Sequence, residues 1–351
     1  MNQNPTLRPF LEKMRAYTPG EQMNGPQIVK LNTNENPYPP APAVMEEIQA
    51  ALGRLRLYPN PTSEPLRRAL AAYHGLDPEQ VLVGNGSDEI LRLLVHATIG
   101  PGGCVGMVDP TYSLFPVLSA SFEGTVRVYP LMDREKLPGD VFNGPEPLFI
   151  LPNPNPPIGT LYTRAEIAAL CRGREGRLVA IDEAYVDFAP RDVVPLLAEF
   201  TNLVVTRTFS KSFSLAGVRV GYMLSCASLI EQFGKLKDSY NVNRLSQAAA
   251  SAAIGASACM EENARRIVQT REETASALRA LGYRVPESHG NFLFAIHPEA
   301  ARHYGLLRER GILVRYFDQP LLRDGMRISI GTPEQMARLM TELSDILNPL
   351  S

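Results

Sequence analysis

The chain reads Thr206-Arg-Thr-Phe-Ser-Lys-Ser-Phe-Ser-Leu-Ala-Gly-Val-Arg-Val-Gly-Tyr222 around a lysine, Lys211, whose surroundings are unusual. The apolar run from Leu203 to Val205 comes just before this stretch and predicts a buried strand. Lys211 therefore follows the end of a strand, with Arg219 close by in the sequence. A desolvated amine near a fixed positive charge has a lowered pKa, so it becomes a neutral nucleophile that forms a Schiff base with a carbonyl compound.

The serines around this lysine supply a second clue. Ser210, Ser212 and Ser214, together with Arg219, offer the hydroxyl and guanidinium donors that a phosphate needs. A Schiff-base lysine beside a phosphate site indicates one cofactor, pyridoxal 5'-phosphate (PLP). A lone lysine after a strand is usually a solvated loop residue, so the surrounding pattern decides. From Ser210 to Tyr222 the sequence resembles the lysine signature of fold-type I PLP-dependent aminotransferases.

The bulk properties fit a globular enzyme of ordinary composition. The 351 residues are 44% hydrophobic and 21% charged, which suits a large domain with a smaller companion. The formal net charge of -2 gives no sign of nucleic acid or an anionic membrane as partner. No apolar run approaches the roughly 18 residues of a membrane span, so we expect a cytoplasmic protein. The widely spaced cysteines and the histidines form no metal-like pair, so we expect no metal site.

Apolar strands alternate with amphipathic helices through most of the chain. This alternation predicts an α/β fold, with a large domain whose mainly parallel seven-stranded sheet is covered by helices on both faces. Strands near the end of the series are expected to be antiparallel. The expected strands are Gln80–Val83, Cys104–Val108, Thr125–Tyr129, Leu148–Leu151, Leu178–Ile181, Asn202–Thr206 and Gly221–Leu224. The expected helices are Ala43–Leu55, Glu64–His74, Asp88–Ile99, Arg164–Arg172 and Ala227–Lys237.

The sequence pattern changes after about Asn241, where an Ala-rich stretch predicts one or two long helices. Short strands and a last helix follow, which indicates a small α+β domain. The expected elements are helical residues 245–281, strands Phe292–Ile296, Ile312–Arg315 and Met326–Ile330, and helix Pro333–Ile346. We expect residues 1–45 to form an N-terminal arm and part of the small domain, residues 46–241 the large PLP-binding domain, and residues 242–351 the small C-terminal domain.

A glycine-rich turn, Val83-Gly-Asn-Gly-Ser-Asp-Glu-Ile90, joins a predicted strand directly to a predicted helix. Backbone N–H groups at a helix N-terminus favour a phosphate, and glycine lets the backbone approach it. A tight turn with a capping residue is the ordinary structural alternative. The segment resembles the loop of histidinol-phosphate aminotransferases, a subgroup of the family above. That resemblance implies that Gly86, Ser87 and Asp88 contact the cofactor phosphate.

Asp182 ends a predicted buried strand in Val179-Ala-Ile-Asp-Glu-Ala-Tyr185. An isolated buried carboxylate is costly, and pairing with a protonated pyridine nitrogen reduces that cost while keeping the ring electron-accepting. Tyr185, three residues later, is placed to hydrogen-bond the 3'-oxygen of the ring. A strand-end aspartate that caps a turn is the alternative, but Asp-Glu-Ala-Tyr matches the fold-type I pattern.

Two further elements match the family in order. The loop Leu151-Pro-Asn-Pro-Asn-Pro-Pro-Ile-Gly-Thr160 resembles its Asn-Pro-Asn-x-Pro-Thr-Gly pattern, with Ile158 in place of threonine. In the family the second asparagine, here Asn155, hydrogen-bonds the 3'-oxygen. Tyr112, in Val108-Asp-Pro-Thr-Tyr-Ser113, occupies the position that stacks on the cofactor ring.

The resemblance implies further contacts to the phosphate. Thr208, Ser210 and Arg219 complete the phosphate site on the same subunit. Tyr58, at the start of a Tyr-Pro segment, corresponds to a tyrosine that reaches the phosphate of the neighbouring subunit. The family pattern therefore implies a homodimer with shared active sites.

Segments outside the cofactor site resemble the histidinol-phosphate subgroup. Its Asn-Glu-Asn-Pro segment corresponds to residues 34–37, where we expect Asn36 to bind substrate. Its N-terminal lid corresponds to the segment that contains Tyr17, which we expect to contact the substrate. Arg327 occupies the family position for the α-carboxylate, and Arg315 assists; a surface salt bridge is the alternative for each. The implied reaction exchanges an amino group between L-histidinol phosphate and 2-oxoglutarate, with Lys211 as the general base. The products are imidazole-acetol phosphate and L-glutamate.

Other functions share this scaffold. An aromatic amino-acid aminotransferase has the same cofactor site, and a PLP decarboxylase resembling threonine-phosphate decarboxylase shares the lysine pattern. A non-enzymatic regulator resembling aminotransferases would carry an added DNA-binding domain, for which the residues before the Asn-Glu-Asn-Pro segment leave no room. The presence of Lys211 is a second argument against a regulator, because a protein without catalytic activity does not need this lysine.

Overall fold

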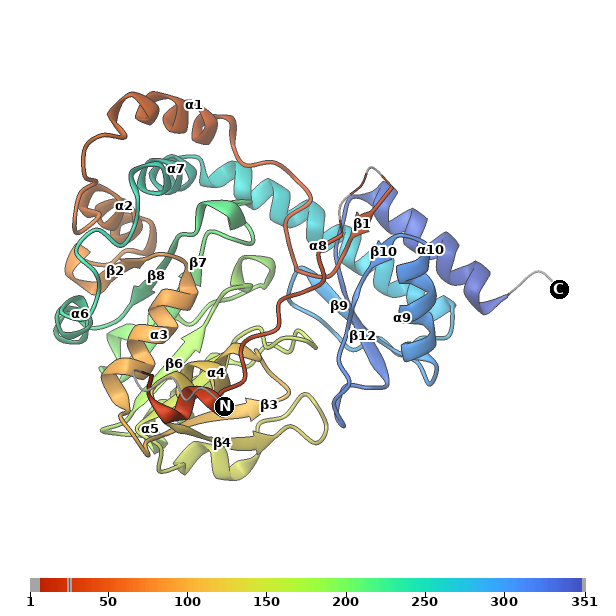
Figure 1. The fold of residues 1–351 in the computed structure, drawn as a ribbon, viewed down its shortest axis with the longest axis horizontal. Coiled ribbons are helices and arrows are strands. Elements are labelled where there is room, and N and C mark those ends of the chain that lie inside the picture. The colour runs from red at the N-terminus through yellow and green to blue at the C-terminus, as the bar shows by residue number, and fades with distance from the viewer. Residues whose placement is uncertain (1–6, 24, 26, 349–351) are drawn as a thin grey trace.

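The computed structural model describes residues 7–23, 25 and 27–348, which form a large lobe and a small lobe (Figure 1). The large lobe is built on a seven-stranded sheet. Strand β8 runs antiparallel to both of its neighbours, and the other paired strands are parallel, as expected from the strand–helix alternation. In spatial order the strands are β2 (Val81–Gly84), β8 (Gly221–Leu224), β7 (Leu203–Thr208), β6 (Leu178–Asp182), β5 (Leu148–Pro152), β3 (Cys104–Asp109) and β4 (Thr125–Pro130).

Helices cover both faces of this sheet. Alternate strand residues such as Val204 and Ile150 pack into one apolar cluster, while Val205 and Leu151 pack into another on the opposite face. The first cluster is covered by α3 (Ser87–Thr98), α4 (Leu114–Ser121) and α6 (Ala227–Gly234). The second includes side chains of α2 (Glu64–His74) and α5 (Arg164–Gly173). Central strands such as β5 and β7 are therefore buried on both sides, whereas most residues of the edge strand β4 are exposed.

The small lobe contains a three-stranded antiparallel sheet and three helices. Strand β1 (Val29–Lys30) of the N-terminal arm pairs in parallel with β10 (Ile312–Leu313), so the arm is joined to this lobe (Figure 1). The sheet order is β11 (Arg315–Tyr316), β12 (Gly325–Ser329) and β9 (Phe292–Ile296). The helices are α8 (Ser257–Ala280), α9 (Ala300–Glu309) and α10 (Pro333–Leu347).

The Ala-rich stretch forms two helices, α7 (Arg244–Gly255) and α8, whose packing partners differ. Helix α7 packs against α1 (Pro42–Ala51) and α2, both in the large lobe, whereas α8 packs against β9 and α10 of the small lobe and also against the 3-10 helix Val186–Phe188 of the large lobe (Figure 1). A division after Asn241 therefore separates helices that pack together. We propose that the domain boundary lies near the start of α8, at about Ser257.

Several elements differ from the sequence expectation. Helices α4 and α9 were not predicted; α4 is apolar nearly throughout and carries a proline, so it lacks an amphipathic pattern. The expected strand Ile312–Arg315 is divided between β10 and β11, which belong to different sheets. Short 3-10 helices connect the larger elements: Pro9–Glu12, Leu52–Arg54, Pro78–Gln80, Gly139–Asn143, Val186–Phe188, Val194–Ala198 and Ala216–Val218. None of the described helices is both long and apolar enough to cross a membrane.

Candidate active site

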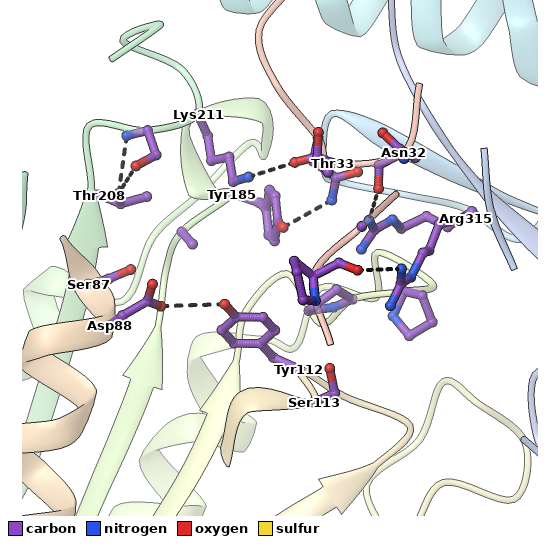
Figure 2. Close-up of a pocket in the computed structure, with 18 of the residues that line it drawn as sticks. Asn32, Thr33, Ser87, Asp88, Tyr112, Ser113, Tyr185, Thr208, Lys211 and Arg315 are labelled. Carbon is purple, nitrogen blue, oxygen red and sulfur yellow. Dashed lines mark hydrogen bonds between the residues drawn. The ribbon is translucent and has the colours of Figure 1, made fainter. Parts of the chain in front are cut away.

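One pocket gathers most of the residues that the sequence singled out. It lies where β6 and β7 end and where the small lobe and the N-terminal arm meet the large lobe (Figure 2). Twelve of the sixteen expected site residues line it: Tyr17, Ser87, Asp88, Tyr112, Asp182, Tyr185, Thr208, Ser210, Lys211, Arg219, Arg315 and Arg327. The carboxyl ends of parallel strands are a common place for a ligand site in such folds.

Lys211 follows β7 by three residues and points into this pocket (Figure 2). Its Nζ donates a hydrogen bond to the backbone carbonyl of Thr33 at 3.1 Å and lies 5.6 Å from the centre of the Tyr185 ring. Burial, followed by the positive charge of Arg327, lowers the pKa of Lys211 to about 8. At neutral pH a larger share of this amine is neutral than for an exposed lysine, so it is a better nucleophile.

Asp182 is the last residue of β6, and it is buried. The hydroxyl of Thr206 donates a hydrogen bond to its Oδ1 at 3.0 Å. Burial nevertheless raises the pKa of Asp182 to about 6. A cation placed against this carboxylate within the pocket would favour its charged form and lower that pKa.

Glycines bring the N-terminus of α3 against Arg219. Gly86 is the residue before the helix and has a φ of +83°, and a Cβ added there would lie 2.5 Å from the Arg219 guanidinium. A Cβ added at Gly221 would lie 2.3 Å from the backbone nitrogen of Ser87. Only glycine therefore permits this close approach. The result is a helix N-terminus beside a guanidinium, two features that favour an anion.

Arg219 is held by its neighbours at this end of the pocket. Its Nη1 donates to Ser210 Oγ at 3.2 Å, and its Nη2 donates to Asp88 Oδ2 at 3.1 Å. The hydroxyl of Tyr112 donates to the other oxygen of Asp88 at 3.4 Å, and Thr208 Oγ1 donates to Ser210 Oγ at 3.0 Å. A carboxylate only accepts hydrogen bonds, so Asp88 orients Arg219 and Tyr112 in this arrangement.

The opposite end of the pocket carries two arginines of the small lobe. Arg327 of β12 lies directly across from Arg315 of β11 in the sheet. Arg327 Nη2 donates to the carbonyl of Asn32 at 2.7 Å, while its Nε is buried without a partner in the part of the chain that the structure describes. Burial, with a further contribution from the charge of Arg315, lowers the pKa of Arg327. This end therefore holds concentrated positive charge.

The N-terminal arm closes one side of the pocket. Arg315 donates from Nη1 to the carbonyl of Pro19 at 3.2 Å and from Nη2 to that of Thr18 at 3.3 Å. Beside them the ring of Tyr17 meets that of Tyr112 edge to face, with centroids 6.1 Å apart and planes at 72°. Arg315 thus fastens the arm next to the position where Tyr17 faces the pocket.

Besides Gly86, three expected residues do not line the pocket. Asn36, expected to bind substrate, instead donates from Nδ2 to the carbonyls of Lys211 and Ser212 at 3.1 and 3.0 Å, while its Oδ1 accepts from the backbone of Tyr38. Its amide is used inside the fold, where it fixes the backbone beside the lysine, and the binding of substrate by Asn36 stays a prediction.

Asn155 and Tyr58 are the other two. Asn155 is fully buried; its Oδ1 accepts from Thr111 at 2.7 Å and its Nδ2 donates to the carbonyl of Pro110 at 2.9 Å. One Nδ2 hydrogen remains for a ligand. Tyr58 is 76% exposed and stacks on Tyr240 with ring centroids 4.5 Å apart, and it is not among the residues that line the pocket.

The pocket also contains residues that sequence reasoning did not assign. Asn32, Thr33 and Asn34 line it, and so does Phe317. Thr33 and Asn32 contribute backbone carbonyls, which carry no signal in a sequence. Asn34 is the first residue of the Asn-Glu-Asn-Pro segment, which was the available signal for it.

Two histidines lie close together in the small lobe. His297, Glu299 and His303 bring potential ligand atoms within 4.8 Å of one another, although no spacing in the sequence suggested a metal-like group. The backbone N–H of Glu299 donates to His297 Nδ1 at 3.1 Å, so the neutral ring carries its proton on Nε2 and cannot ligate there. Tyr283 bonds His303 Nδ1 at 2.7 Å. The absence of a metal stays a prediction.

Comparisons with known proteins agree with this geometry. Residues 26–343 match the family model "Aminotransferase class I and II". A histidinol-phosphate aminotransferase of Microcystis aeruginosa is 39% identical over 342 residues, covering 97% of this chain and 98% of that protein. The crystal structure of histidinol-phosphate aminotransferase from Sinorhizobium meliloti in complex with pyridoxal-5'-phosphate superposes with a TM-score of 0.89 at 26% identity, covering all of both chains.

A more distant likeness concerns the fold alone. The structure of L-threonine-O-3-phosphate decarboxylase from Porphyromonas gingivalis has a TM-score of 0.82 at 23% identity, covering 91% of this chain and 99% of that one. The match to the family model and the near full-length relatives carry more weight. The chain belongs to the class I and II aminotransferase family, with histidinol-phosphate aminotransferases among its relatives.

Proposed function

We propose that this protein uses PLP to transfer an amino group between L-histidinol phosphate and 2-oxoglutarate, producing imidazole-acetol phosphate and L-glutamate in histidine biosynthesis. The near full-length relatives with this activity in their names support the reaction. The observation that carries the proposal is a single pocket with Lys211 and Asp182 between two arginine-rich ends. No specific observation favours the aromatic or decarboxylase alternatives.

The donors of the pocket fit PLP. The N-terminus of α3, Ser210 and Arg219 form a phosphate site, and the glycine cradle that brings them together would be filled by any Cβ. Asp182 is a buried carboxylate whose pKa is raised by burial, and a protonated ring nitrogen beside it would favour its charged form. When bound, PLP would supply an aldehyde-derived carbon that takes up amino groups and a ring that accepts electrons from the substrate Cα.

Each residue then has a definite task. Asp182 keeps the ring nitrogen protonated, and Tyr112 packs against the ring. Tyr185 and Asn155 direct hydrogen bonds toward the 3'-oxygen. Lys211 would hold PLP and would act as the base that takes the proton from the substrate Cα. A pKa of about 8 suits a general base that works near neutral pH.

Arg327 and Arg315 bind the anionic groups of both substrates. Histidinol phosphate carries a phosphate where glutamate carries its α-carboxylate, and a guanidinium binds either group through paired donors. The Nε of Arg327 is buried without a partner in the described structure, so it is available to such an anion. Tyr17, on the arm that Arg315 fastens, lines the same pocket and contacts the substrate from the arm.

The proposed assembly is a cytoplasmic homodimer that shares active sites. Tyr58 is 76% exposed, and the neighbouring Leu52, Leu55 and Leu57 are 42%, 56% and 46% exposed. So many exposed apolar side chains in one segment favour a protein–protein interface. In the dimer Tyr58 reaches the cofactor phosphate of the neighbouring subunit.

A single-turnover absorbance experiment on the PLP-loaded protein tests the reaction. L-histidinol phosphate, phenylalanine, tyrosine and threonine phosphate are added separately without a keto acid. Rapid conversion of the cofactor to its amine form with histidinol phosphate, and at least about tenfold slower conversion with the others, is expected. Equal rates with the aromatic amino acids would replace the proposal by an aromatic transaminase. Release of CO2 from threonine phosphate would replace it by a decarboxylase.

A further inference from the structure

Three successive residues of the N-terminal arm each contact a different polar side chain of the pocket. The carbonyl of Asn32 accepts from Arg327 at 2.7 Å, and that of Thr33 accepts from Lys211 at 3.1 Å. The side-chain amide of Asn34 then donates to the hydroxyl of Tyr185 at 3.0 Å. Figure 2 shows the Lys211 and Tyr185 bonds converging on this one segment. Of the three contacts, only the one from Asn34 is made by a side chain.

Hydrogen bonds from the small lobe fix the backbone and the side chain of Asn34. It is 1% exposed and has a φ of +55°, a left-handed conformation that asparagine tolerates better than most residues. Its carbonyl accepts from Asn291 Nδ2 at 3.0 Å. Its backbone N–H donates to Ser329 Oγ at 2.8 Å, and Ser329 Oγ donates to Asn34 Oδ1 at 2.8 Å. The side chain therefore has one orientation.

The direction of each hydrogen bond in this chain follows from its first member. A backbone N–H can only donate, so Ser329 Oγ accepts from Asn34 and must use its own proton toward Asn34 Oδ1. Oδ1 is then the acceptor end of the amide, and Nδ2 is the end that donates to Tyr185. The Tyr185 oxygen accepts that bond, which leaves its own proton free to be donated elsewhere.

We propose that Asn34 is a positioning residue for the reaction, which aims the hydroxyl proton of Tyr185 into the pocket toward the 3'-oxygen of the cofactor. The inference rests on the proposed function, because it assigns Tyr185 to that oxygen. Asn34 acts only through Tyr185. The arm and the small lobe thereby set the hydrogen bonding of a group that the large lobe supplies.

Other charged and titratable groups face Tyr185 and must be distinguished from Asn34. Burial raises the pKa of Tyr185, and the positive charge of Arg327 opposes that rise. Asp182 and Asp88 add negative charge, and Lys211 Nζ lies 5.6 Å from the ring. The test therefore changes Asn34 with and without the Tyr185 hydroxyl, so that these groups stay constant within each comparison.

Asn34→Asp keeps the size of the side chain, the acceptor for Ser329 and a residue type that tolerates the positive φ. It replaces the donating amide by a carboxylate oxygen, so the Tyr185 proton turns toward residue 34 and away from the cofactor. The 3'-oxygen then loses a hydrogen-bond donor and holds a proton more firmly. The pH midpoint of the visible absorbance of the PLP-loaded protein is expected to rise by about one unit.

The same substitution in the Tyr185→Phe background is the control, since the added charge remains while the phenol is gone. There the midpoint is expected to move by less than about a third of a unit. Equal shifts in both backgrounds would mean that Asn34→Asp acts by its charge alone, and the proposal would be overturned. Asn34→Gly, neutral and tolerant of the positive φ, removes the hydrogen bond donated to Tyr185 without adding a charge. If the Asp variant fails to load PLP, a midpoint that changes with Tyr185 present but not in the Tyr185→Phe background supports the proposal, and no change in either background overturns it.

Two failures have different meanings in this design. If the unaltered protein develops no visible absorbance with PLP, the proposed function fails. If it does, and Asn34→Asp leaves the midpoint unchanged, only the role of Asn34 fails. Thermal melting of the cofactor-free variants shows whether the fold is retained, which separates positioning from a loss of structure.

Discussion

The two ends of the pocket both contain an arginine, but the two arginines are held in opposite ways. Arg219 has a side chain that is 44% exposed, and it already contacts the carboxylate of Asp88 and the hydroxyl of Ser210. Arg327 contacts only neutral groups among its hydrogen-bond partners in the described structure, and its Nε has no partner there. Burial lowers the pKa of Arg327, a sign that its charge lacks compensation.

The difference matches the two tasks proposed for these arginines. A guanidinium fixed by a resident carboxylate is preorganised, and together with a helix N-terminus it suits a phosphate that stays bound through many turnovers. A guanidinium without a resident anion binds whichever anion enters, so it suits a phosphate and a carboxylate that alternate. The comparison therefore predicts that damage at one end affects cofactor retention and damage at the other affects substrates.

The largest effect should come from Lys211, which lies between the two ends. Lys211→Ala leaves both arginines in place, so phosphate-bearing ligands are still expected to bind. Turnover with histidinol phosphate and 2-oxoglutarate should fall by about 10⁴-fold or more, because the base and the attachment point are lost together. Steady-state kinetics measures the loss, and equilibrium dialysis measures PLP binding. Activity within tenfold of the unaltered protein would refute the central role of this lysine.

Arg327→Ala should produce the next largest change. Removing a buried charged partner of an anion costs roughly 2–5 kcal/mol, so kcat/KM for histidinol phosphate and for glutamate should each fall about 30- to 5,000-fold. Arg327→Lys keeps the charge without the forked geometry, and an intermediate loss is expected. PLP affinity should change less than about threefold. A loss confined to one of the two substrates would break the comparison, since it would show that the anions bind at different places.

Arg219→Ala should have the opposite effect, with a loss of PLP affinity and little change in the kinetics of the substrates, and the loss should be smaller. The PLP dissociation constant should rise about tenfold, because one partner of the phosphate is lost while the N-terminus of α3 and Ser210 remain. With saturating PLP, kcat/KM for both substrates should stay within about fivefold of the starting value. Fluorescence titration of the cofactor-free protein gives the first number and steady-state kinetics the second. A large substrate effect at saturating PLP would mean that the two ends are not separate.

Much of the pocket could be predicted because its groups lie at the ends of strands. Asp182 and Lys211 follow apolar runs, and parallel strands bring their carboxyl ends to one edge, so sequence order alone placed them together. The turn before α3 was equally readable from its glycines. Ile158, which departs from the family pattern, packs with Phe294 and Ile296 of the small lobe, a purpose that only the structure reveals.

The arm could not be predicted in the same way. Its contacts join residues separated by more than 150 positions, and two of them use backbone carbonyls, which every residue possesses. Asn36 shows the consequence: the segment was recognised, but a side-chain amide can serve a ligand or the backbone equally well, and here it bonds the carbonyls of Lys211 and Ser212. The pairing of β1 with β10 rests on two residues per strand, too few for a periodic signal.

The smallest predicted effect is also the most direct measure of how the two ends differ. Burial and the charge of Arg327 lower the pKa of Lys211 to about 8, and Arg219 contributes least among the groups that act on it. The neutral amine is the form that attacks the PLP aldehyde. The rate of PLP capture by the cofactor-free protein should therefore rise about tenfold from pH 6 to pH 7 and level off above about pH 8.

Stopped-flow absorbance between pH 6 and pH 10.5 measures this profile, with Lys211→Ala as the blank. Removing the charge of Arg327 favours the protonated amine, so Arg327→Ala should move the midpoint to higher pH, and Arg219→Ala should move it less. A midpoint near the 10.5 of an ordinary lysine would contradict the buried environment. Equal shifts from the two substitutions would show that both arginines act equally strongly on the pKa of the Lys211 amine. The two ends of the pocket would then not differ in their electrostatic effect on this lysine.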